Sequence, residues 1–241
     1  ETIMSLTLKQ GDNDFEKLEK GIYHATCFRM VDLGTQDNTY KGETNKKMKV
    51  QIDFEITEAL DPDNSEVKMA DGRPFGVGKE YTASLFESAN LRKDLESWRG
   101  KSFTQEELDS LELTDFLGCT VKIEVGLTQQ TAEFAGGNPK IMRLSEPRNG
   151  TEQVATVNPQ VAFDMSVYCD EFNGNSNANS KAMCDVFDEV PAYLQKKVEE
   201  SYEYRAAVEK GARASTVEVE APAESLADLA SSSDDDDKLP F

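Results

Sequence analysis

The sequence predicts a mainly β protein with additional helices, of the α+β class. Two observations lead to this prediction. Residues 47–56 alternate strictly between apolar and polar, which is typical of a half-buried strand, and residues 88–100 carry a helical pattern between stretches rich in β-forming residues. With 38% hydrophobic and 30% charged residues among 241, the chain can bury a core and keep a large polar surface.

Three strands are expected in the first part of the chain. The first is Gly21–Leu33, followed by a polar loop over Gly34–Asn45. The second is Lys47–Ile56, whose apolar face should be buried and whose polar face should be solvated. The apolar face consists of Met48, Val50, Ile52, Phe54 and Ile56, and the polar face of Lys47, Lys49, Gln51, Asp53 and Glu55. The third is Phe75–Phe86, and the side chains expected to point inward from it are Val77, Tyr81, Ala83 and Leu85.

Two helices are expected next. Ser88 is the expected N-cap of the first, which ends at Gly100. Its apolar face consists of Leu91, Leu95 and Trp98. Thr104 and Glu107 have the spacing of a capping box, so a short second helix should begin there.

Strands resume at Cys119–Val125 and Lys140–Leu144. Three strands, a helical insertion and two further strands follow one another in the order of an OB-fold, a five-stranded Greek-key barrel with its helix between strands 3 and 4. Residues 1–150 are therefore expected to form an OB-fold core, in which Trp98 closes the bottom of the barrel.

The rest of the chain divides into an extension and a tail. Residues 151–211 are expected to form an extension that ends in a helix, Ala192–Lys210, packed on or near the core. Residues 212–241 hold two basic and eight acidic residues and few large apolar ones, so they are expected to form a disordered acidic tail.

The tail ends in a run of acids followed by a short apolar end. The residues of this tip are Asp234, Asp235, Asp236, Asp237, Leu239, Pro240 and Phe241, with Lys238 interrupting them. The tip resembles the C-terminal peptide of bacterial and phage single-stranded DNA-binding proteins. This resemblance implies that the tip recruits replication proteins of the phage or the host, such as a polymerase, primase or helicase. A terminal Phe ring can enter an apolar pocket while its α-carboxylate pairs with Arg or Lys.

Two other interpretations of the tip stay open. Asp234–Lys238 is also a protease-cleavage sequence used in protein expression, and an acidic tail can act only as a solubilising segment. A cleavage sequence would normally precede a target protein, and a solubilising tail needs no aromatic terminus. We therefore favour recruitment.

The core also resembles a widespread family of phage-encoded proteins. Its members share a KxYTxSL strand, an LRKDLExWRG helix and an FTxEEL continuation, which correspond here to residues 79–85, 91–100 and 103–108. The resemblance covers roughly residues 20–205 and implies an OB-fold encoded near replication genes. Together, the core and the tip imply a phage single-stranded DNA-binding protein that serves DNA replication, recombination and repair in the host cytoplasm.

The charge distribution allows a DNA-binding surface despite a net charge of −20. Residues 1–150 hold 19 basic and 27 acidic residues, and several of the basic ones cluster. Single-stranded DNA needs a basic groove for its phosphates and aromatic rings for its bases, and in an OB-fold this surface is the outer face of strands 2 and 3. The expected DNA-binding residues are Phe28, Arg29, Tyr40, Lys41, Lys46, Lys47, Lys49, Lys79 and Tyr81.

Within this set, the lysines are expected to contact phosphates, and Phe28 and Tyr40 to stack on bases. The alternative for the lysines is an ordinary solvated face of a strand. Four aromatic residues are better explained as members of the core, namely Phe54, Phe75, Tyr81 and Phe86.

Catalysis is not expected. The chain has a single histidine, His24, and no GxxxxGK[ST] phosphate loop, and its four cysteines form no CxxC pair. We therefore expect no catalytic residue, metal or cofactor, and no apolar run approaches the length of a membrane helix.

Two alternative functions remain: an acidic adaptor that binds replication enzymes without touching DNA and, with less support, a metal-dependent nuclease built from carboxylates. The oligomeric state stays open, and a homo-oligomer is allowed.

Overall fold

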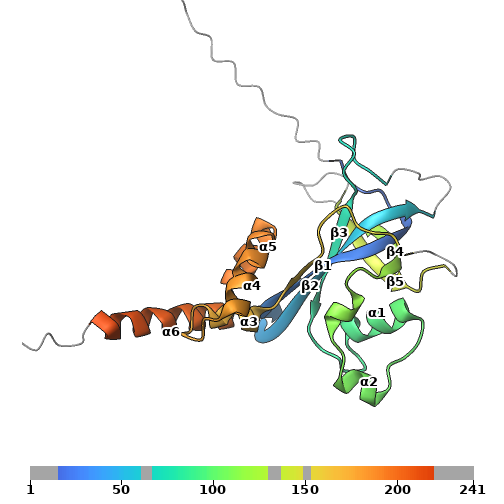
Figure 1. Cartoon of the computed structure of the whole chain (residues 1–241). Helices are drawn as coiled ribbons and strands as arrows, with labels where there is room; N and C mark the ends of the chain where they lie inside the picture. The colour runs from blue at the N-terminus through green and yellow to red at the C-terminus, as the bar shows by residue number, and fades with distance from the viewer. Residues whose placement is uncertain (1–15, 61–66, 130–136, 149–152, 220–241) are drawn as a thin grey trace, which may run out of the picture.

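The protein is described by a computed structural model over residues 16–60, 67–129, 137–148 and 153–219, with the side chains of Tyr40 and of residues 212–219 outside the description. It combines helices with a mainly antiparallel, open sheet (Figure 1). The strands are β1 (Gly21–Tyr40), β2 (Glu43–Ala59), β3 (Gly76–Thr82), β4 (Thr120–Leu127), β5 (Pro139–Ser145) and β6 (Val161–Phe163). The helices are α1 (Asn90–Arg99), α2 (Gln105–Asp109), the short 3-10 helix η1 (Leu113–Phe116), α3 (Met165–Asp170), α4 (Ala178–Asp188), α5 (Ala192–Glu199) and α6 (Tyr202–Val219).

The sheet has the strand order β3-β2-β1-β4-β5, and each neighbouring pair is antiparallel. The short β6 adds to β1 in parallel. The five strands expected from the sequence are all present with shifted ends, and α1 and α2 lie between β3 and β4 in the chain, as expected. The predicted combination of antiparallel strands with separate helices is therefore confirmed.

The long β1–β2 hairpin differs from the prediction. The sequence indicates a loop over Gly34–Asn45, whereas β1 continues to Tyr40 and β2 begins at Glu43. Lys41 (φ 52°) and Gly42 (φ 85°) form the two-residue turn, and positive φ at both positions is the requirement of a type I′ hairpin turn. This end of the hairpin extends beyond the main core, so its strands are polar on both faces and lack the alternation that marks a half-buried strand.

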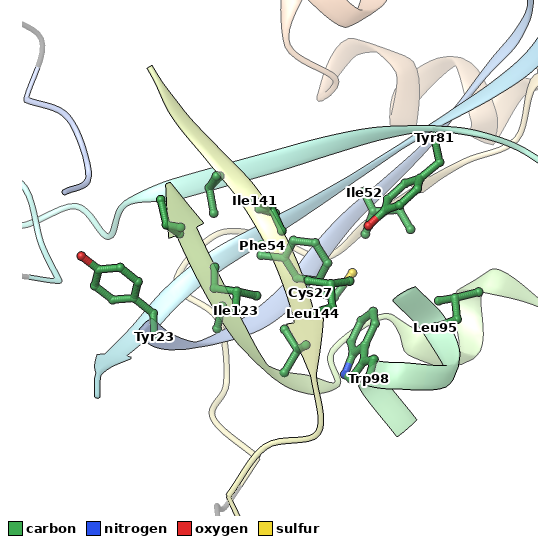
Figure 2. Close-up of a cluster of buried hydrophobic side chains, with 14 of the residues drawn as sticks. Tyr23, Cys27, Ile52, Phe54, Tyr81, Leu95, Trp98, Ile123, Ile141 and Leu144 are labelled. Atoms are coloured by element: carbon green, nitrogen blue, oxygen red, sulfur yellow. The ribbon is translucent and has the colours of Figure 1, made fainter. Parts of the chain in front are cut away.

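The main core lies between the inner face of the sheet and α1 (Figure 2). Four of the five predicted apolar residues of β2 are buried, but Met48 is 50% exposed because it belongs to the part of β2 that leaves the core. Trp98 projects from α1 against the sheet, where its Nε1 donates a hydrogen bond to the Thr120 carbonyl oxygen at 2.8 Å. Its ring meets those of Phe54 and Phe116 at centroid distances of 5.4 and 5.0 Å.

The ends of α1 and α2 follow the sequence closely. Gly100 ends α1 in the left-handed conformation (φ 74°), and α2 starts with the predicted capping box between Thr104 and Glu107. The N-cap of α1 is Ala89 rather than the expected Ser88, and no side chain caps that end. Glu107 also accepts a hydrogen bond from Arg99 at 2.6 Å, so it joins the end of α1 to the start of α2.

We expect this junction to weaken in acid. The Arg99 hydrogen bond, helped by the Thr104 backbone N–H, lowers the pKa of Glu107 from 4.5 to about 2. A carboxyl whose pKa is lower in the folded state stabilises the fold above its unfolded pKa and loses that contribution as protons bind. Glu107→Gln should therefore lower the Tm at neutral pH, and the difference from wild type should vanish between pH 4.5 and about 2. Thermal unfolding over a pH series measures this, with Glu112→Gln as an exposed control; a pH-independent difference would contradict it.

The four helices α3 to α6 form a helical extension on the far end of the hairpin (Figure 1). They share a second core with β6 and with Val31 and Leu33 of β1. Gly34 is required at this contact, because a Cβ there would lie 2.8 Å from Ser201 Cβ in a backbone with φ of 64°.

The C-terminal helix differs from the prediction in two ways. The expected single helix Ala192–Lys210 is divided into α5 and α6, with Glu200 as the C-cap of α5. Gly211 does not end α6, which continues to Val219. The first residues of the expected tail 212–241 thus belong to a helix, and the rest of it lies outside the described residues.

Candidate nucleic-acid interface

The part of the outer face of β2 from Gln51 to Glu55 is buried, which corrects the expectation that the whole polar face is solvated. Gln51, Asp53 and Glu55 point away from the main core yet are at most 7% exposed. Asp53 accepts hydrogen bonds from Arg29 Nε at 2.7 Å and from Gln51 Nε2 at 2.6 Å. The neighbouring position on β3 is Gly78, and a Cβ there would collide with the Asp53 and Gln51 side chains. These polar groups therefore form a closed network on the sheet.

The chain itself covers this face. Glu55 accepts hydrogen bonds from the backbone N–H groups of Val157 and Asn158, both at 2.8 Å, and from Asn158 Nδ2 at 2.6 Å. The Thr26 hydroxyl donates to the Val154 carbonyl oxygen at 3.1 Å. A single strand could not lie along the middle of this face without displacing the segment that precedes β6.

Two predicted contact residues of β1 belong to this covered face. The Phe28 ring is buried, with the Arg29 guanidinium 4.9 Å from its centroid. Arg29 is held by Asp53. Neither side chain is presented to an incoming base as the sequence predicted.

Tyr81 and Lys79 face α1. The buried Tyr81 hydroxyl and the Lys79 amine both donate to Asp94, at 2.9 and 2.6 Å. Burial, followed by the nearby Asp94 charge, raises the pKa of Tyr81. Tyr81 is thus a core residue, as the alternative interpretation held, whereas Lys79 is half-buried, with 22% of its side chain exposed.

One groove gathers three of the predicted lysines. It encloses about 490 Å³ at the edge of β3 and the start of α1. Its lining consists of Lys47, Lys49, Lys79, Glu80, Tyr81, Thr82, Ser84, Phe86, Ser88, Ala89 and Asn90. We call it the β3-edge groove.

Phe86 is a second aromatic residue, after Phe28, whose position differs from the prediction. It was expected in the core, but it is 80% exposed at the rim of the β3-edge groove. The sequence predicts a strand that continues to Phe86, whereas β3 ends at Thr82 and Phe86 lies in the connection to α1. A basic groove with an exposed aromatic ring is the combination that single-stranded nucleic acids need.

The remaining predicted contact residues lie on the hairpin or beyond the described chain. Lys41 is exposed in the hairpin turn, and Lys46 places its Nζ 3.6 Å from the centroid of the Tyr202 ring. The Tyr40 side chain is outside the described residues. So is the whole predicted tip, namely Asp234, Asp235, Asp236, Asp237, Leu239, Pro240 and Phe241.

A hollow of about 600 Å³ below Trp98 includes Arg99, Phe103 and Glu107, but its Arg99 and Glu107 already pair with each other. Within residues 16–60, 67–129, 137–148 and 153–219, no group of three or more His, Cys, Asp or Glu side chains could hold a metal ion. Burial raises the pKa of each of the four free thiols. None of the helices described is long and apolar enough to span a membrane.

Comparison of the chain with protein families, with curated proteins and with solved structures finds no match to any of them. The features that bear on function are therefore the geometry of the β3-edge groove and the sequence of the tip.

Proposed function

We propose that the protein binds single-stranded DNA without sequence specificity and recruits replication and recombination proteins through its acidic C-terminal tip. The β3-edge groove is the observation that carries this proposal. Lys47, Lys49 and Lys79 supply positive charge for phosphates in an otherwise acidic protein, and Phe86 offers an exposed ring for a base. Stacking on a ring tolerates every base, so this combination favours binding without sequence preference.

The sheet topology supports an OB-fold as the scaffold of this site. The order β3-β2-β1-β4-β5 and the close approach of β3 to β5 fit a barrel left open at that seam. Helix α1 packs against β3 and β5 at this seam, in keeping with the helical insertion of that fold.

The tip carries the second half of the proposal. Its aspartates would steer it to a basic surface on a polymerase, primase or helicase, and Phe241 would enter a pocket there. Such a protein would act in phage replication, recombination and repair within the host cytoplasm.

Binding of a fluorescent dT oligonucleotide across a salt series tests the proposed function. The full chain and a 1–219 truncation, which keeps the whole of α6, should both bind, with affinity falling as salt rises. The truncated form should bind more tightly, because removing the acidic tail reduces repulsion of the phosphates. Absence of binding by both forms at low salt would leave the acidic adaptor as the better explanation, and cleavage that requires a divalent ion would favour the nuclease.

A further inference from the structure

We propose that α5 and the start of α6 form the second wall of the single-strand site, and that Glu80 is the counter-ion that a DNA phosphate displaces there. This inference rests on the proposed function and extends it to the helical extension, where the sequence indicates no DNA-binding residue. It concerns one ion-pair cluster and one aromatic contact, both at the junction between the sheet and the helices.

The ion-pair cluster joins three elements. Glu80 of β3 accepts a hydrogen bond from Lys197 of α5 at 2.6 Å and lies 3.4 Å from Lys49 of β2. Burial alone would raise the pKa of Glu80, but the two lysines, Lys197 foremost, lower it, so this carboxylate is charged. The Lys197 and Glu80 side chains are 43% and 33% exposed, so an incoming phosphate can reach them.

The aromatic contact lies on the neighbouring part of the hairpin. Tyr202, at the start of α6, is flanked by Lys46 of β2 and by Arg205, whose guanidinium carbon is 4.7 Å from the ring centroid. Its hydroxyl donates to Asp37 of β1 at 2.8 Å. Helices α5 and α6 thus each bring a basic side chain, Lys197 and Arg205, to the region where they contact the sheet.

The chemistry of the cluster resembles that of a phosphate site. A carboxylate between two ammonium groups occupies the place that a phosphate oxygen would take between them. Glu80 pairs with both Lys49 and Lys197 in the free protein and offsets part of their charge, and it repels a strand that enters the β3-edge groove. DNA binding then exchanges the Glu80 pairs for phosphate pairs, and the strand runs from Phe86 past Lys49 onto α5.

Substitutions of Lys197 and Glu80 test separately whether Lys197 contacts a phosphate and whether Glu80 is displaced by one. Lys197→Gln should weaken dT binding and reduce the slope of log K against log salt by about 0.7, the amount for one phosphate contact on a single strand. Glu80→Gln should strengthen binding by about fivefold, because DNA no longer has to break exposed ion pairs. Lys197→Arg keeps the charge and should restore the slope. The matched controls are Lys196→Gln, on the same helix but paired with Glu200, and Glu124→Gln on the exposed face of β4.

The outcomes distinguish this inference from the proposed function. If wild type binds dT and the Lys197→Gln and Glu80→Gln variants behave like their controls, the second wall is wrong and the β3-edge groove alone binds DNA. If Lys197→Arg fails to restore the slope, Lys197 acts by holding α5 in place rather than by contacting phosphate, which also overturns the inference. If neither wild type nor any variant binds at low salt, the proposed function itself is wrong.

Discussion

Replacing Phe86 by alanine should lower the affinity for single-stranded DNA by about 5- to 150-fold. Loss of base stacking on an aromatic ring costs about 1–3 kcal/mol per base, which corresponds to that range. The ring is 80% exposed, so its removal leaves no cavity in the core and the free energy of unfolding should change little. Anisotropy titrations with a dT oligonucleotide and thermal unfolding of the same samples measure both quantities.

A conservative variant provides the control for this result. Phe86→Tyr keeps a stacking ring at the same position and should bind within a few-fold of wild type. The salt dependence should be unchanged in both variants, because neither removes a charge. Equal affinities of the Phe86→Ala variant and wild type would show that this ring does not stack on DNA.

Replacing Trp98 by alanine should have the opposite pattern of effects. Trp98 is 3% exposed and fills the space between α1 and the sheet, so its truncation leaves a large cavity. Losses of about 3–5 kcal/mol in the free energy of unfolding are typical of such changes. The substitution also removes the hydrogen bond to the Thr120 carbonyl oxygen.

Urea unfolding of the Trp98→Ala and Trp98→Phe variants measures this effect. Trp98→Phe retains much of the apolar volume and should lose less stability than Trp98→Ala. Where Trp98→Ala remains folded, dT affinity should stay close to wild type, because Trp98 is not among the residues of the β3-edge groove. A Trp98→Ala variant as stable as wild type, with weakened dT binding, would mean that Trp98 is a stacking residue and not a core residue.

The elements that pack directly against the main core could be predicted from the sequence. Val50, Ile52, Phe54 and Ile56 alternate because each is buried against the same core, and Leu91, Leu95 and Trp98 recur at helical spacing for the same reason. The capping box at Thr104 is local, so it depends on residues a few positions apart and can be read directly.

Features that depend on contacts distant in sequence could not be predicted in this way. Gln51, Asp53 and Glu55 are typical of a solvated strand face, but all three are buried. Glu55 accepts hydrogen bonds from Val157 and Asn158, about one hundred residues away in sequence. Asp53 accepts one from Arg29 on the neighbouring strand. The far end of the hairpin lacks the alternation of a half-buried strand because it lies beyond the main core. The nearest buried apolar residues of β1, Val31 and Leu33, contact the helical extension instead.

The candidate site likewise combines residues that the local sequence could indicate with residues that only distant contacts bring together. Lys47, Lys49 and Lys79 line the same groove because β2 and β3 are neighbouring strands, as the sequence interpretation assumed. Lys197 could not be selected, since only the docking of α5 on the sheet brings it to Glu80. The exposure of Phe86 could not be predicted from its apolar character, because it depends on where β3 ends and how the chain turns into α1.

Photocrosslinking of a dT oligonucleotide to the full chain, followed by mass spectrometry of tryptic peptides, tests the central claim most directly. We predict crosslinking in peptide 80–92, which contains Phe86 and part of the β3-edge groove, and loss of that crosslink in the Phe86→Ala variant. Crosslinks confined to peptides outside the β3-edge groove and α5–α6, for example on β4 or β5, would contradict the account.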